Sequence, residues 1–166
     1  MSLNKAFLAE LHYESGLTRK VLQRIPADKL SWAPHQKSMT LSRLATHIAD
    51  IHRWPVFMVG ADELDAAKTS LAPVPLSSPD AILQSFEQNL SSTMAALESA
   101  DDEQMGKPWT FRFGDHVIFS MPRKQVLRGM VMSHIIHHRG QLTVYLRMLD
   151  VPVPSVYGPS ADEQAF

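Results

Sequence analysis

The sequence predicts an all-α fold, a four-helix bundle with long crossover connections that also allows a short β-hairpin before the last helix. Four segments place apolar residues three and four positions apart, as amphipathic helices do, and loops bearing proline or glycine separate them. At 166 residues, with 45% hydrophobic and 20% charged residues, the chain has the size and composition of a globular protein. We therefore expect a single domain over residues 1–166.

The first two helices are expected before residue 60. The first runs over about 3–25, where apolar residues recur with helical spacing, and a proline-bearing loop follows it. The second begins after Ser38 or Thr40, either of which is a good N-cap, and continues to about Val59. Pro55 lies inside it and predicts a kink or a locally broken turn, because proline cannot donate a helical hydrogen bond.

The third and fourth helices follow a long connector, ADELDAAKTSLAPVPLSS. Ser78 is the expected N-cap of a helix over about 79–99, which has proline in its first position. Next, KPWTFRFGDHVIFS alternates aromatic and polar residues around a Gly-Asp pair at 114–115, which is typical of a short hairpin. The last helix is expected over about 122–149, a length of roughly 40 Å at 1.5 Å per residue.

Charge and composition exclude several classes of function. A net charge of −1 argues against a nucleic-acid-binding surface, which needs a basic excess. The absence of cysteine excludes disulfides, zinc–thiolate sites and a protein thiol nucleophile, so any thiol must arrive with a ligand. The first residues are amphipathic and partly acidic, unlike a signal peptide, and no apolar run is long enough to span a membrane. A cytoplasmic location is the expectation.

Two histidines interrupt the apolar face of the last helix. Residues four apart share a helix face, so the rings of His134 and His138 can point at one atom. His137 lies on the shoulder of that face; spacing alone also permits a His134/His137 pair, but the apolar register favours His134/His138. The predicted core positions of this helix are Leu127, Val131, His134, His138, Leu142, Tyr145 and Leu149.

A third histidine interrupts the apolar face of the second helix. His47 lies three positions after Leu44 and four before Ile51. Neutral imidazole is a common ligand of zinc, nickel, copper and iron, so one histidine from this helix and two from the last form a plausible metal site. The alternative is that these are core histidines satisfied by hydrogen bonds.

Other polar residues carry weaker expectations. His52 is about 140° around the helix from His47, which predicts an outer-face or interface position. Asp50 either orients a metal ligand or is solvated. Arg139 is expected to pair with a carboxylate or cap the end of the bundle, and the basic cluster within 123–128 is expected on a wet face.

Two stretches resemble a known family. HIIHHRGQLTVYLRMLDVPVPSVYGPSADE resembles the terminal helix and tail of the DinB/YfiT-like family of metalloenzymes, and KLSWAPHQKSMTLSRLATHIADIHRW resembles its loop and second helix. The resemblance implies a four-helix bundle, often dimeric, that binds a divalent metal through three histidines. Position by position, the implied ligands are His47, His134 and His138, with His137 as the adjacent non-ligand.

Three neutral ligands leave a metal with its full charge and with open positions, which is typical of a catalytic site rather than a structural one. We therefore expect a metal-dependent enzyme, containing zinc or nickel, that activates a thiol or water against a small electrophile. The resemblance favours a low-molecular-weight thiol and S-transfer, with hydrolysis next. Expected partners are a small-molecule substrate and a second copy of the chain, with neither nucleic acid nor membrane. The alternatives are a bundle with a purely structural metal and a dimeric interaction module without metal. No residue beyond the ligands stands out as a general base.

Overall fold

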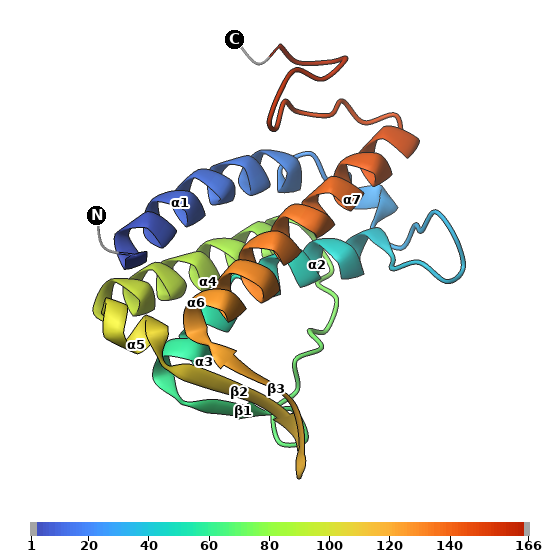
Figure 1. The fold of residues 1–166 in the computed structure, drawn as a ribbon. Helices are drawn as coiled ribbons and strands as arrows, with labels where there is room; N and C mark the ends of the chain where they lie inside the picture. The colour runs from blue at the N-terminus through green and yellow to red at the C-terminus, as the bar shows by residue number, and fades with distance from the viewer. Residues whose placement is uncertain (1–2, 165–166) are drawn as a thin grey trace.

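A computed structural model describes residues 3–164 and is mostly helical (Figure 1). The helices are α1 (Leu3–Leu22), α2 (Leu41–Ile51), α3 (Trp54–Gly60), α4 (Pro79–Ser99), α5 (Asp102–Gly106), α6 (Arg123–Val126) and α7 (His134–Met148), with a short 3₁₀ turn η1 (Ala27–Lys29) and a π-helical segment η2 (Leu127–Ser133). The strands are β1 (Glu63–Asp65), β2 (Pro108–Phe113) and β3 (His116–Pro122).

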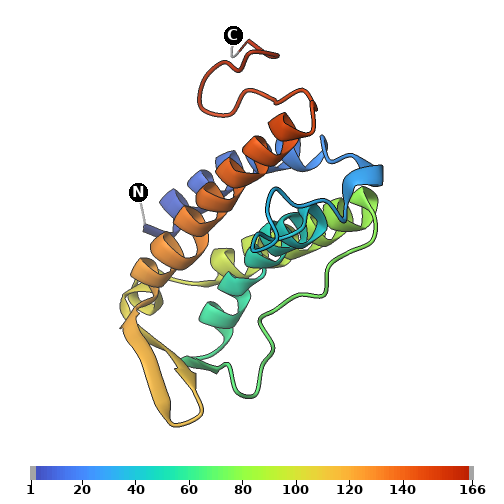
Figure 2. The ribbon, with the colours of Figure 1, turned by 90° about the vertical axis from the view of Figure 1, so that its right-hand side faces the viewer.

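Four helices pack around the core. Helices α4 and α7 each contact both α1 and α2. Figure 2 shows α1 beside α7 and α2 beside α4, with the small sheet at one end and the C-terminal tail at the other. The connector between α3 and α4 runs outside these helices (Figure 2). The fold is mostly helical, as predicted, with long connections between the packed helices, but it also contains a small sheet.

The sheet has three strands, so the predicted hairpin describes only part of it. Strands β2 and β3 pair antiparallel around Gly114, whose φ of +56° favours glycine at the turn. Strand β1 comes from the connector after α3 and pairs parallel with β2. At three residues, β1 is too short to leave an alternating pattern in the sequence, which is why the prediction missed it.

Capping residues and proline set the helix ends much as predicted. The Ser78 side chain accepts a hydrogen bond from the Ala81 backbone N–H at 3.1 Å. At the start of α2, Thr40 rather than Ser38 is the cap, since its hydroxyl accepts from Arg43 N–H at 3.2 Å. The predicted second helix is broken between α2 and α3, and Pro55 lies in the first turn of α3. The predicted local break at Pro55 is confirmed.

The predicted last helix is interrupted near its start. Residues 127–133 form a π-helix, in which hydrogen bonds link residues five apart, and the regular α-helix begins only at His134. Leu127 and Val131 are buried as predicted. Beyond the π segment His138 and Leu142 are buried as predicted, whereas His134, Tyr145 and Leu149 are only half-buried. The fully buried positions of α7 are Ile135, Arg139, Leu142 and Leu146.

A polar layer divides the core into two apolar clusters. One cluster lies toward the sheet and includes Leu11 and Ile135, and the other lies toward the tail and includes Val21 and Leu142. Between them each long helix carries buried polar side chains, which need hydrogen-bond partners because water does not reach them. These side chains are Glu14, Ser15 and Thr18 in α1, Thr93 in α4, and His138 and Arg139 in α7.

An ion pair fills one side of this layer. Arg139 Nη2 lies 2.6 Å from Glu14 Oε2, and the two side chains are only 2% and 7% exposed. Arg139 Nη1 also donates to the Glu14 carbonyl at 2.9 Å. The Tyr157 hydroxyl donates to Glu14 at 2.7 Å, which brings the tail back onto α1. Desolvation and this hydrogen bond raise the pKa of Tyr157 to about 12, so it remains a donor. The expectation that Arg139 pairs with a carboxylate is confirmed.

His52 is fully buried, so its predicted outer-face position is wrong. His52 keeps helical backbone dihedrals at the end of α2, and the side of α2 that it faces packs against α4 rather than facing solvent. The His52 Nδ1–H donates to the Ile48 carbonyl at 2.8 Å, and the ring meets Phe86 edge-on at 4.7 Å. Its Nε2 has no partner among residues 3–164. Burial lowers the pKa of His52 to about 4, because a second proton would leave a charged group without a partner.

Arg123 is also buried, at 2% exposure, whereas Lys124 and Arg128 are exposed as predicted. Its guanidinium donates to the carbonyls of Met58 at 2.7 Å and Pro108 at 2.9 Å. It thereby joins the end of α3 to the first strand of the hairpin. It also pairs with the Asp62 carboxylate at 2.5 Å. The prediction failed for Arg123 because these acceptors lie 15 or more positions away in the sequence, where local spacing gives no sign of them.

We predict that the buried ion pair contributes far more stability than an exposed pair on the same helix. Glu14→Gln leaves the Arg139 charge buried and should lower the free energy of unfolding by about 3 kcal/mol in urea denaturation. The matched control is Glu10→Gln, which breaks the exposed contact with Arg128 and should cost less than about 1 kcal/mol. Equal losses in the two variants would contradict the assigned role of the layer.

We predict that His52 makes the protein less stable as the pH falls from about 6.5 to 4. In that range the unfolded state takes up a proton at its ordinary pKa of about 6.5, while the folded state, with a pKa of about 4, does not. At 1.36 kcal/mol per pKa unit the loss reaches about 3 kcal/mol by pH 4. The measurement compares the free energy of unfolding of wild type and His52→Leu across this range, where shared groups cancel. A difference that does not change with pH would refute the assignment.

Candidate metal centre

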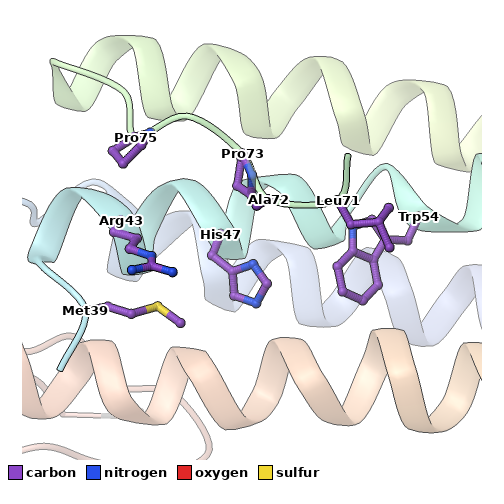
Figure 3. Close-up of a pocket in the computed structure, with 8 residues that line it drawn as sticks. All are labelled: Met39, Arg43, His47, Trp54, Leu71, Ala72, Pro73 and Pro75. Carbon is purple, nitrogen blue, oxygen red and sulfur yellow. The ribbon is translucent and has the colours of Figure 1, made fainter. Parts of the chain in front are cut away.

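The structure brings the three predicted histidines together. Helix α2 supplies His47, and the first turn of α7 and the turn after it supply His134 and His138. The Nε2 atom of His134 lies 3.3 Å from that of His47 and 2.8 Å from that of His138. One ring nitrogen from each histidine lies within 4.8 Å of the others. Figure 3 shows the His47 ring leaving α2 toward α7.

His137 does not join this group. Its side chain is exposed, and its ring centroid lies 4.9 Å from that of His138. The spacing allowed a His134/His137 pair or a His134/His138 pair. In the structure it is the His134/His138 pair that lies beside His47.

The outer nitrogens of two rings face hydrogen-bond acceptors. His138 Nδ1 lies 2.7 Å from Gln141 Oε1, and His134 Nδ1 lies 3.3 Å from the Met130 carbonyl. Oxygen atoms of this kind accept, so each Nδ1 must carry the hydrogen, and each Nε2 is left with a lone pair. Such contacts fix the orientation of metal-binding histidines. Gln141 lies three positions after His138, a helical neighbour that the sequence analysis did not identify as its partner.

The donor set fits a cation. With both Nδ1 atoms donating outward, the Nε2 atoms of His134 and His138 are two acceptors 2.8 Å apart with no hydrogen between them. A metal ion shared by the rings removes that repulsion. Two nitrogens bound to one tetrahedral zinc at about 2.05 Å lie about 3.3 Å apart, and the spacing between His47 and His134 is 3.3 Å.

Protonation of a ring would also remove the repulsion between the nitrogens, but it is less favourable here than metal binding. Burial lowers the pKa of all three histidines. Nearby imidazoles lower it further: His138 and His134 act on His47, His138 and His137 act on His134, and His137 acts on His138. For His47 these effects bring the pKa to about 4. The rings are therefore neutral near pH 7, which is the form that binds metals.

Trp54 closes one side of the cluster. Its ring centroid lies 5.4 Å from that of His134 and 6.1 Å from that of His47. Asp50 holds this indole by accepting from its Nε1–H at 3.1 Å, and it also accepts from Arg53 at 2.5 Å. Asp50 is therefore neither solvated nor bonded to a ligand histidine. It positions the ring that shields the histidines from water.

A pocket of about 540 Å³ opens beside the cluster (Figure 3). The connector before α4 forms one wall, held to α2 by Ser42, which donates to the Leu76 carbonyl at 2.5 Å, and by Thr46, which accepts from Leu76 N–H at 3.0 Å. Among the described residues that line the pocket, Arg43 alone carries a full charge. The lining residues are Met39, Arg43, His47, Trp54, Leu71, Ala72, Pro73 and Pro75.

The family model of the DinB family matches residues 1–165. The chain belongs to the DinB family. This confirms the family resemblance found in the two sequence stretches.

Relatives of this DinB-family chain agree with that placement. The uncharacterized protein YrdA of Bacillus subtilis (strain 168) is 29% identical over 168 residues, which cover 96% of this chain and 90% of YrdA. The crystal structure of a DinB-like protein from Bacillus cereus ATCC 10987 matches with a TM-score of 0.73 and 27% identity, over 92% of this chain and 97% of that one. The DinB-like protein YjoA of Bacillus subtilis shares the fold, with a TM-score of 0.68 at 18% identity over 95% and 98% of the two chains.

Within residues 3–164, no helix combines the length and apolar character needed to cross a bilayer.

Proposed function

We propose that this chain is a divalent-metal-dependent enzyme. In this proposal His47, His134 and His138 hold one zinc or nickel ion, and the site activates a low-molecular-weight thiol, or water, against a small electrophile. The observation that carries the proposal is the convergence of three histidine ring nitrogens, one of them from a residue that lines an open pocket. Three protein ligands are the number typical of catalytic zinc, whereas structural zinc is usually held by four.

When bound, such an ion lowers the pKa of a coordinated thiol or water and so supplies a nucleophile near neutral pH. The protein contributes fixed geometry to this chemistry. Gln141 and the Met130 carbonyl fix the rings of His138 and His134. Trp54, held by Asp50, keeps water away from one side.

Arg43 favours a thiol over water as the nucleophile. It lies one helical turn before His47, on the pocket wall. Its side chain is exposed, and none of the ion pairs found within residues 3–164 involves it. A guanidinium without a carboxylate partner is suited to a carboxylate on a ligand. Since the chain has no cysteine, an external thiol that carries a carboxylate supplies both the sulfur and a partner for Arg43.

A structural metal is the second candidate function. The three histidines come from α2 and α7, so a shared ion would join two helices of the bundle. This alternative predicts a large loss of thermal stability on chelation and no turnover with any pair of thiol and electrophile. The enzyme predicts turnover that depends on the metal.

We predict about one divalent ion per chain in untagged protein prepared without chelator, measured by elemental analysis. His134→Ala should remove the ion, because two remaining histidines do not make a stable site. His137→Ala is the matched control, an exposed neighbour on the same helix that should keep the metal content of wild type. A well-folded wild type without metal, or an equal loss in both variants, would falsify the proposal.

We predict that Arg43 recognises the negative charge of the thiol. The assay is the substitution of chloride in 1-chloro-2,4-dinitrobenzene, in which the sulfur–carbon bond forms and chloride leaves. Arg43→Met should raise KM for 3-mercaptopropionate about tenfold or more with little change in kcat, because a charge-assisted hydrogen bond is lost. KM for uncharged 2-mercaptoethanol should not change, and Arg43→Lys should retain part of the effect. Equal changes for both thiols would contradict this role.

A further inference from the structure

The connector between α3 and α4 forms one wall of the larger pocket with a segment that makes no hydrogen bonds. We call residues 70–75 the strap. Within residues 3–164, no hydrogen bond has its donor or acceptor in the strap. The strap nevertheless supplies half of the described residues that line the pocket, and Figure 3 shows it running beside α2. These residues are Leu71, Ala72, Pro73 and Pro75.

The strap also lies outside the apolar core. On either side of it, Leu64 packs against the core cluster toward the sheet, and Leu76 packs against the cluster toward the tail. Between them Leu71 belongs to neither cluster, and Val74 is 82% exposed. A segment with few buried apolar contacts and no hydrogen bonds changes conformation at a low cost in free energy. The strap is therefore the part of the pocket wall that is best able to move.

Both ends of the strap are held in place. Before it, the Asp65 carboxylate accepts from the Gly114 N–H of the hairpin turn at 2.9 Å, and the Asp65 carbonyl accepts from Thr69 N–H at 3.0 Å. After it, two hydroxyl groups of α2 bind both backbone groups of Leu76. The prolines within the strap restrict its backbone, because the proline ring fixes φ. These features favour a short, stiff segment that moves between two fixed ends, as hinged lids do.

The two walls of the pocket differ in polarity. The α2 wall carries Arg43 and His47, whereas every residue that the strap contributes is apolar. Leu71 also lines a smaller cavity of about 160 Å³, as does Trp54, so the strap begins beside the ring that shields the histidines. An apolar wall that moves inward removes water from the polar wall without adding groups that compete for the metal.

We propose that the strap is a lid that closes over the pocket when a ligand binds beside the metal centre. The ends at Asp65 and Leu76 serve as hinges, and the strap moves toward α2. Closure covers the ligand with the apolar side chains of the strap and excludes water from the nucleophile. The benefit to catalysis rests on the proposed function, whereas the movement itself does not require turnover.

The test follows the strap by fluorine NMR, because the chain contains no cysteine and a single introduced thiol can be alkylated selectively. Val74→Cys carries a trifluoroacetone label on the strap, and Val144→Cys, which replaces an exposed valine of α7, is the matched control. Without ligand, relaxation dispersion should detect exchange on the microsecond-to-millisecond timescale at position 74 and not at position 144. Zinc and 3-mercaptopropionate together should make the closed form, a minor state of roughly 0.1–10% in the free protein, the major one, and should leave the control signal unchanged.

Ser42→Ala is the second variant. Ser42 donates to the Leu76 carbonyl at the downstream hinge and is not one of the three histidines. Loss of this neutral hydrogen bond, about 1 kcal/mol, should lower the ratio of closed to open form about fivefold, with the metal content unchanged. The lid is overturned if position 74 shows no more exchange than position 144, if bound 3-mercaptopropionate leaves its signal unchanged, or if Ser42→Ala leaves the ratio unchanged. If calorimetry shows that 3-mercaptopropionate does not bind, the proposed function fails, and exchange in the free protein alone decides on the lid.

Discussion

The structure depends on a polar layer that crosses the middle of the bundle. A polar group inside an apolar core is costly unless it finds a partner. On one side of the layer Arg139 and Glu14 neutralise each other and Tyr157 completes the group, while the hydroxyl of the adjacent Ser15 has no hydrogen-bond partner among the described residues. On the other side the histidine rings satisfy their outer nitrogens, while their inner nitrogens face one another. Adjacent residues of α7, His138 and Arg139, serve these two sides, so the ion pair and the metal centre are positioned by the same turn of helix.

The sequence predicted the parts of the fold that follow from local rules. Helix α4 matches its predicted span because Ser78 and Pro79 are a strong start signal, and the break near Pro55 follows from the missing N–H. The three histidines were found because each interrupts an apolar face at helical spacing. What was missed involves distant parts of the chain or very short elements. The partners of Arg123 include carbonyls 15 and 65 positions away and the Asp62 carboxylate 61 positions away, and strand β1 has only three residues.

The two cavities divide the chemistry by polarity. The larger one is lined by His47 and the charged Arg43, and the smaller one, of about 160 Å³, is lined only by aromatic and aliphatic side chains, methionine included. Trp54 belongs to both, and Asp50 fixes its indole nitrogen. Because this hydrogen bond spans one turn at the junction of α2 and α3, the break in the predicted second helix also serves the site. It turns Trp54 toward the histidines and starts α3, whose Phe57 and Met58 line the smaller cavity.

The π-helical segment lies directly before the two histidines that the last helix contributes to the candidate metal centre. Of the core positions predicted for this helix, Leu127, Val131, His138 and Leu142 are buried, whereas His134, Tyr145 and Leu149 are only half-buried. Ile135 and Leu146 are buried in place of their neighbours His134 and Tyr145, so the buried face is displaced by one residue at these two positions. A turn with an extra residue rotates the side chains that follow it relative to a regular α-helix, which accounts for a displacement of this kind. The displacement leaves His134 half-buried, where its ring meets that of His47. π-helical turns occur often at functional sites, and here the irregularity directly precedes the histidine pair that meets His47.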